Sequence, residues 1–154
     1  MRLQYPVVLG NIKPTREIIR LARKGDSLDF TNGIAVEKLP RELIDLAALK
    51  GYAPADCTCL GLHGRGSVLP HTDDVYGDAA LVWLVADTGA SALMVARGGK
   101  DGVLEMSVGD VCLFPSLEYH AWVSRSSWAM CVVDVSAKQR LQHRDYRLVK
   151  NRKP

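Results

Sequence analysis

Short apolar runs separated by turn-forming residues fill the chain after residue 55. Eight of them lie near 56–63, 68–72, 79–86, 91–96, 103–106, 110–114, 119–124 and 128–136, with turn signals at 87–89 and 98–102. Short aliphatic runs bounded by Gly, Pro, Asp or Ser are typical of the strands of all-β sandwiches and barrels. The pattern therefore predicts a mainly β core of eight strands.

Two stretches before this core carry the spacing of amphipathic helices. The first opens at Pro14 with Ile18 and Leu21 on one stripe and ends at Lys24-Gly25, and the second runs from Pro40 to Lys50-Gly51. Gly51 suits the left-handed position that often ends a helix. Residues 33–36, between the two helices, have the pattern of a strand.

Length and composition favour one domain. The chain has 154 residues, enough to bury a core without disulfides, so its four cysteines are expected to be free thiols. We expect helical support over 1–54, a β core over 55–136 and a tail over 137–154. No apolar run reaches 18 residues and the start lacks the pattern of a signal peptide, which predicts a cytoplasmic protein without a membrane span.

Charge is concentrated at the C-terminal end. The net charge is +3, but residues 138–154 hold seven Lys or Arg and one Asp, or +6, so the rest of the chain carries −3. Such a tail can contact nucleic-acid phosphates, or it can be a solvated end.

Three residues form the main candidate site: His71, Asp73 and His120. In a strand, residues two apart point to the same face, so the side chains of His71 and Asp73 can bind the same metal ion. Two imidazoles and a carboxylate form the facial triad of non-haem Fe(II) oxygenases. The competing interpretation is a polar turn around Pro70 and Asp74 that only ends a strand.

The surroundings of these residues resemble a known family. A strand and Gly turn over 60–69 precede His71, an aliphatic strand with Trp83 follows, and Gly109-Asp110 leads through a strand and Pro115 to His120. Residues 55–136 resemble the double-stranded β-helix (jelly roll) core of Fe(II)/2-oxoglutarate oxygenases of the prolyl-hydroxylase type, and cupins share the later spacing. The resemblance implies that His71, Asp73 and His120 bind Fe(II), with 2-oxoglutarate as cosubstrate and hydroxylation as the reaction. From strand pattern alone, an immunoglobulin-like sandwich fits as well.

The family's basic residue for 2-oxoglutarate is missing. Family members carry Arg or Lys about ten residues past the distal His, where this chain reads Ser-Trp-Ala-Met-Cys over 127–131. Arg125, in a serine-rich turn, and Arg97, near the end of another strand, are the candidate replacements, since a guanidinium pairs well with a carboxylate.

Other residues near the motif have more than one interpretation. His63 is a further ligand, a proton relay or a surface residue, and Cys57 and Cys59 are either part of a zinc site or small core residues. Four aromatic residues either wall the site or belong to the ordinary core: Trp83, Tyr119, Trp122 and Trp128.

Three functions follow from these features. The first is an Fe(II)/2-oxoglutarate dioxygenase acting on a small molecule, a protein or a nucleic acid. The second is a cupin-like metal protein or enzyme that does not use 2-oxoglutarate, and the third is a noncatalytic binding module that uses the basic tail. The pattern of strands is also compatible with a homodimer.

Overall fold

The structure is a computed structural model, and it describes Leu3 and residues 6–25, 31–72, 78–89, 91–95 and 102–138. Its helices are α1 (Arg16–Ala22) and α2 (Arg41–Leu49), with a 3-10 turn, η1 (Val36–Lys38), before α2. Its strands are β1 (Val7–Asn11), β2 (Thr31–Ala35), β3 (Tyr52–Pro54), β4 (Thr58–Arg65), β5 (Val68–His71), β6 (Ala79–Asp87), β7 (Ser91–Val95), β8 (Val103–Met106), β9 (Asp110–Phe114), β10 (His120–Ser124) and β11 (Ser127–Ala137). The protein is mainly β, with two helices in its N-terminal third, as the hydrophobic pattern predicts.

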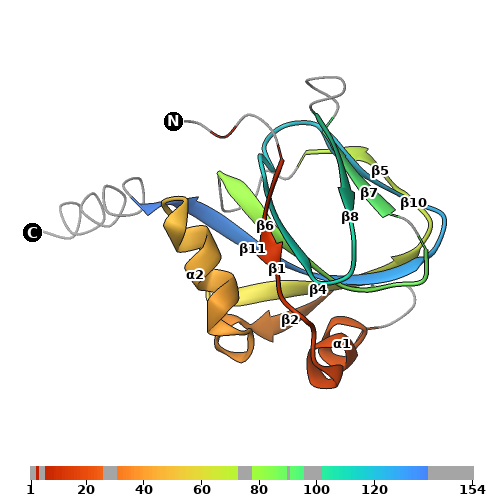
Figure 1. Ribbon diagram of the computed structural model, residues 1–154, viewed down its shortest axis with the longest axis horizontal. Coiled ribbons are helices and arrows are strands. Elements are labelled where there is room, and N and C mark those ends of the chain that lie inside the picture. The colour runs from red at the N-terminus through yellow and green to blue at the C-terminus, as the bar shows by residue number, and fades with distance from the viewer. Residues whose placement is uncertain are drawn as a thin grey trace, which may run out of the picture.

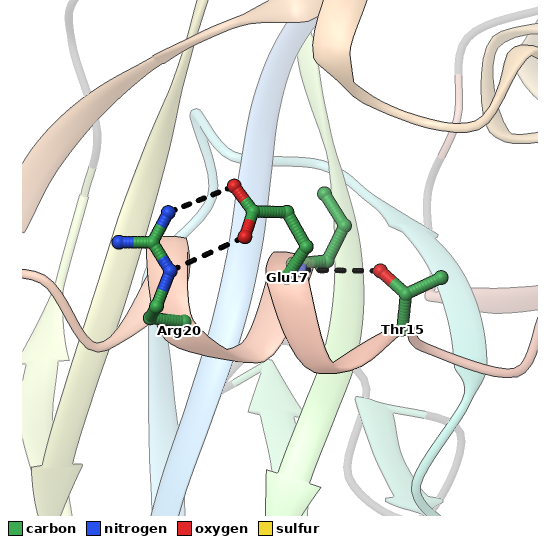
Figure 2. A network of polar contacts seen from close by, with 4 residues as sticks. Thr15, Glu17 and Arg20 are labelled. Atoms are coloured by element: carbon green, nitrogen blue, oxygen red, sulfur yellow. Dashed lines mark hydrogen bonds and ion pairs between the residues drawn. The ribbon is translucent and has the colours of Figure 1, made fainter.

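Local side-chain contacts define helix α1. The Thr15 hydroxyl accepts a hydrogen bond from the backbone N–H of Ile18 at 3.2 Å, which satisfies one of the free donors of the first turn. Glu17 and Arg20 form a two-pronged ion pair on the exposed face, with N···O distances of 2.8 and 3.2 Å (Figure 2). Hydrogen bonding to Arg20 lowers the pKa of the Glu17 carboxyl.

Helix α2 begins and ends where the sequence predicts. It starts directly after Pro40 and ends at Leu49, and Gly51 has a φ of 84°, the left-handed conformation expected after a helix. Helix α1 is shorter than predicted, since it ends at Ala22 rather than at Lys24-Gly25.

All strand pairs are antiparallel and form two sheets. The larger sheet has the order β1-β9-β6-β11-β4-β2, with β3 paired to the end of β11, and the smaller has the order β5-β10-β7-β8. From β4 onward the pairing is nested: β4 pairs with β11, β5 with β10, β6 with β9 and β7 with β8. The chain from β4 to β11 therefore folds as one long hairpin that is divided between the two sheets.

Alternate residues of the larger sheet serve two separate cores. Along β6, Leu81 and Trp83 belong to a cluster shared with the two helices, whereas Val82 and Leu84 belong to a cluster shared with the smaller sheet. Strands β9 and β11 alternate in the same way. The molecule thus has three layers, with the helices on the outer face of the larger sheet and β5, β7, β8 and β10 on its other side (Figure 1).

All eight strands predicted over 55–136 are present, each with ends within two residues of the prediction, and the strand predicted at 33–36 is β2. Strands β1 and β3 were not predicted. Both are short, and they pair with β9 and with the end of β11, so their formation depends on partners far along the chain. Neither α1 nor α2, the two α-helices of the described residues, is long and apolar enough to span a bilayer.

Candidate metal centre

His71 and His120 lie side by side on adjacent strands of the smaller sheet. His71 ends β5, His120 begins β10, and the two are direct partners in the antiparallel register. Their ring centres are 4.6 Å apart, with 56° between the ring planes. Directly opposed residues project to the same side of a sheet. His120 and Trp122 are two residues apart on β10 and therefore point to the same face. Trp122 belongs to the cluster between the two sheets, so both imidazoles lie on the inner face. The structure thus brings together two of the three residues of the predicted triad.

Both imidazoles are anchored by the same kind of backbone contact. Nδ1 of His71 lies 2.7 Å from the carbonyl oxygen of Leu69, and Nδ1 of His120 lies 2.8 Å from that of Glu118. A carbonyl oxygen only accepts hydrogen bonds, so each Nδ1 is the donor and each neutral ring carries its lone pair on Nε2. This tautomer is the one in which a histidine binds a metal through Nε2 while its other nitrogen is held by a hydrogen bond.

Phe114, at the end of β9, also holds the distal ring in place. Its ring meets the His120 imidazole edge to face, with centres 4.7 Å apart and planes at 67°. His120 is only 4% exposed, so the phenyl ring and the sheet leave it little rotational freedom. Phe114 is not among the predicted site residues, although its place just before Pro115 and the distal histidine was a usable signal.

Asp73, the predicted carboxylate ligand, lies outside the described residues, as does Arg97. In the parts of the chain that the structure describes, no three His, Cys, Asp or Glu side chains are grouped closely enough to hold a metal ion. The described residues thus supply two nitrogen donors, and Asp73 stays a prediction.

Arg125 is not close to the histidine pair. It lies in the turn between β10 and β11, exposed, whereas His120 stands at the opposite end of β10. Five residues of extended chain span roughly 16 Å. The structure therefore places Arg125 at the other end of the two sheets, where it lines a cavity with Arg65.

The inner face between the two sheets is apolar. On β11 it carries Trp128, Met130 and Val132, all buried in the inter-sheet cluster, and on β10 it carries Trp122. The Trp128 indole N–H donates to the Gly66 carbonyl at 2.8 Å. The Trp122 Nε1 atom, equally buried, has no hydrogen-bond partner among the described residues. An unpaired donor in an apolar interior is costly and is a natural contact for a ligand oxygen.

The other predicted aromatic residues are not part of this inner face. Trp83 lies in the cluster on the helix side of the larger sheet and donates to the Ile12 carbonyl at 3.0 Å. Tyr119 is 53% exposed, directly before His120. Among the four aromatic candidates, only Trp122 and Trp128 line the space between the sheets.

His63, Cys57 and Cys59 do not assemble a second site. His63 and Cys59 stand an even number of residues apart on β4 and therefore point to the same face of the larger sheet. Buried Cys59 belongs to the helix-side core, so His63 projects away from His71 and His120. Cys57 is exposed before the strand begins, and all four cysteines are free thiols, as expected. Cys131 lies beside Cys59, and hydrogen bonding between the two lowers the pKa of the Cys59 thiol. Residues 139–154, which hold most of the basic tail, lie outside the described residues.

Comparison with known proteins identifies a similar fold. Protein NMB1881 from Neisseria meningitidis, known from a crystal structure, matches with a TM-score of 0.50 and 14% sequence identity, over 80% of this chain and 100% of that chain. No protein-family model and no curated protein matches the chain. At this identity the likeness concerns the fold alone.

Proposed function

We propose that residues 55–136 form a double-stranded β-helix, or jelly roll, and that the protein is a mononuclear Fe(II)-dependent oxygenase. The nested pairing of β4 with β11, β5 with β10, β6 with β9 and β7 with β8 supports this fold. A double-sheet jelly roll contains eight antiparallel strands in two sheets. The four-strand order β9-β6-β11-β4 in one sheet and β5-β10-β7-β8 in the other agrees with that description.

The observation that carries the proposal is the facing pair of His71 and His120. The backbone contacts at both Nδ1 atoms make Nε2 the atom through which each ring would bind an ion. The ring centres are separated by 4.6 Å. Asp73, two residues after His71, is the proposed third ligand, and this donor set suits Fe(II).

The protein's own residues bind and orient the reactants. The backbone carbonyls of Leu69 and Glu118 fix the two imidazoles, and the apolar inner face keeps water out of the space between the sheets. When bound, iron supplies the capacity to activate oxygen, and the protein supplies position and electrostatics. The family resemblance implies 2-oxoglutarate as cosubstrate and hydroxylation of a C–H bond. Small molecules, protein side chains and nucleobases all match this chemistry.

A second candidate is a cupin-like metal protein or enzyme that does not use 2-oxoglutarate. The specific observation in its favour is the inner face of β11, where Trp128, Met130 and Val132 occupy the region in which the resembled family has its basic residue. Among the described residues, no Lys or Arg side chain is buried, so none is available between the sheets to pair with a distant carboxylate. The two candidates share the metal site and differ in what binds beside the ion.

Metal content tests the shared part of both candidates. We expect about one ion per chain in the native protein and a nearly complete loss in His71→Ala, Asp73→Ala and His120→Ala. His63→Ala is the matched control, because this histidine projects from the other face of the larger sheet. Elemental analysis of the purified proteins gives the result. Equal metal content in the native protein and the three ligand variants would remove the basis of both candidates.

Addition of 2-oxoglutarate to the anaerobic Fe(II) protein separates the two candidates. Chelation of Fe(II) by 2-oxoglutarate produces a visible charge-transfer band, and we expect this band in the native protein and in His63→Ala but not in His71→Ala. Stoichiometric iron without a band would favour the cupin-like candidate. A band that persists in His71→Ala would show that the chelate forms elsewhere.

A further inference from the structure

A cavity of about 370 Å³ lies at the end of the two sheets opposite the histidine pair. It is lined by Arg65, Thr88, Gly89, Arg125, Ser126 and Ser127, which come from the β4–β5, β6–β7 and β10–β11 connections. Arg65 and Ser127 are direct partners across β4 and β11, so strand pairing brings two of these turns together. The only charged residues in this lining are the two arginines, and the cavity is therefore positive.

Both guanidinium groups are available to a ligand. Among the residues that the structure describes, neither Arg65 nor Arg125 has a hydrogen-bond or ion-pair partner. The neighbouring carboxylate, Asp87, accepts hydrogen bonds from the Ser126 hydroxyl and, at 3.1 Å, from the Gly89 N–H. Both bonds end on the same oxygen, Oδ1, and Asp87 forms no ion pair with either arginine among the described residues.

Buried hydroxyl groups hold the turn that carries Arg125. The Ser124 hydroxyl, 6% exposed, accepts from the Ser91 hydroxyl at 2.9 Å and from the Ser126 N–H at 3.1 Å. The Thr88 hydroxyl accepts from the Ser127 N–H at 3.1 Å. Residues on both sides of Arg125 are therefore fixed before any ligand arrives, which lowers the entropic cost of binding.

We propose that this cavity binds the phosphate group of a phosphorylated small molecule. Two guanidinium forks from different turns match the tetrahedral oxygens of a phosphate, which arginine recognises through paired hydrogen bonds. The volume lies at the lower end of the range for small-molecule sites, about 300–1,000 Å³. This site goes beyond the proposed oxygenase function and is independent of the metal.

The adjacent cavity indicates what the rest of the ligand carries. It measures about 670 Å³, shares Gly89 and Arg125 with the first, and is also lined by Asp87, Glu105 and Ser107. Carboxylates and hydroxyls there would accept hydrogen bonds from hydroxyl or amino groups of the ligand. The same two carboxylates would repel the continued phosphate backbone of a nucleic acid, so the structure favours a compact phosphate ester over a polynucleotide.

Calorimetric titration with inorganic phosphate, glycerol 3-phosphate and a short single-stranded oligonucleotide tests the proposal on the full chain. We expect saturable binding of both small ligands, with glycerol 3-phosphate the tighter. Arg65→Gln and Arg125→Gln should each weaken it at least about tenfold, because each removes a charge-assisted contact. Arg23→Gln, on exposed helix-terminal Arg23, removes the same charge elsewhere and should leave binding unchanged. His71→Ala should also leave it unchanged.

Several results would overturn this assignment. Absence of saturable phosphate binding would do so, as would an equal loss in Arg23→Gln, which would indicate a general charge effect. Loss of binding in His71→Ala would place the phosphate at the metal centre. Arginine-dependent binding of the oligonucleotide, without binding of the small phosphates, would identify a nucleic-acid surface in its place. Thermal unfolding of each variant confirms that the exposed substitutions leave the fold intact.

Discussion

Replacing Trp122 by Phe should cost the metal-free protein less stability than replacing Trp128 by Phe. The two indoles are 4% and 5% exposed and meet edge to face with centres 6.0 Å apart, so both substitutions remove a similar piece of buried ring. This shared loss of packing is about 1–2 kcal/mol. Only Trp128 also loses a hydrogen bond, the one to the Gly66 carbonyl.

The difference between the two variants comes from their indole N–H groups. Loss of a hydrogen bond costs about 1 kcal/mol, and removal of an unpaired buried donor returns about 1 kcal/mol or more. Trp128→Phe should therefore lower the free energy of unfolding by about 2 kcal/mol more than Trp122→Phe. Urea unfolding followed by circular dichroism measures both values, provided that the m-values agree. An equal or larger loss in Trp122→Phe would mean that its N–H has a partner in the native protein, and the reasoning would fail.

Three further predictions concern stability. Burial raises the pKa of the Cys112 thiol from 9.0 to about 12. The unfolded chain therefore loses this proton first, and stability falls as pH rises from 9 toward 12. Between pH 8 and 10, the free energy of unfolding measured by urea titration should fall by about 1.4 kcal/mol more in the native protein than in Cys112→Ala. The same pH dependence in both proteins would refute the effect of burial on this thiol. Gly109→Ala should lower the free energy of unfolding by about 1–3 kcal/mol, because φ is 95° and the new Cβ would lie 2.7 Å from the side-chain oxygen of Asn11. Gly51→Ala, with φ 84° and open space, should lower the melting temperature less, and equal shifts would show that the clash is relieved. Leu43→Ala should cost about 2–5 kcal/mol, whereas Leu49→Ala, 83% exposed, should change stability by less than about 0.5 kcal/mol in denaturant titrations. Similar values at the two leucines would contradict the observed packing of α2.

The strands of the β core could be predicted from the sequence because their boundaries are local. At the end of β6, for example, the Asp87 carboxylate accepts a hydrogen bond from the Gly89 N–H at 3.1 Å. The turn that ends this strand is therefore held by residues that are close together in the sequence. Strand β1 has no comparable local signal. Val7–Asn11 pairs with β9, about a hundred residues later, and only the folded chain brings the two together.

The candidate site could be predicted only in part, for a similar reason. Alternation along a strand places His120 and Trp122 on one face, but the pairing of His120 with His71 depends on how β5 and β10 align. That juxtaposition came from the family resemblance and not from local pattern. Arg125 shows the opposite case, because closeness in sequence to His120 suggested closeness in space. An extended strand instead carries Arg125 to the far end of the sheet.

The alternation within the larger sheet also places one core beside the helices and the other beside the proposed metal site. Leu81 and Trp83 face the helices, whereas Val82 and Leu84 face the smaller sheet that carries the histidines. A cavity on the helix side can disturb the imidazoles only if the structural change passes through the larger sheet. A cavity on the inner side lies in the same cluster as Phe114, whose ring contacts His120 directly. Leu81→Ala and Leu84→Ala should therefore destabilise the fold to a similar extent, about 2–5 kcal/mol. Leu84→Ala alone should also weaken metal binding under conditions where both variants are folded, and equal metal affinities would show that the two cores do not act separately on the site.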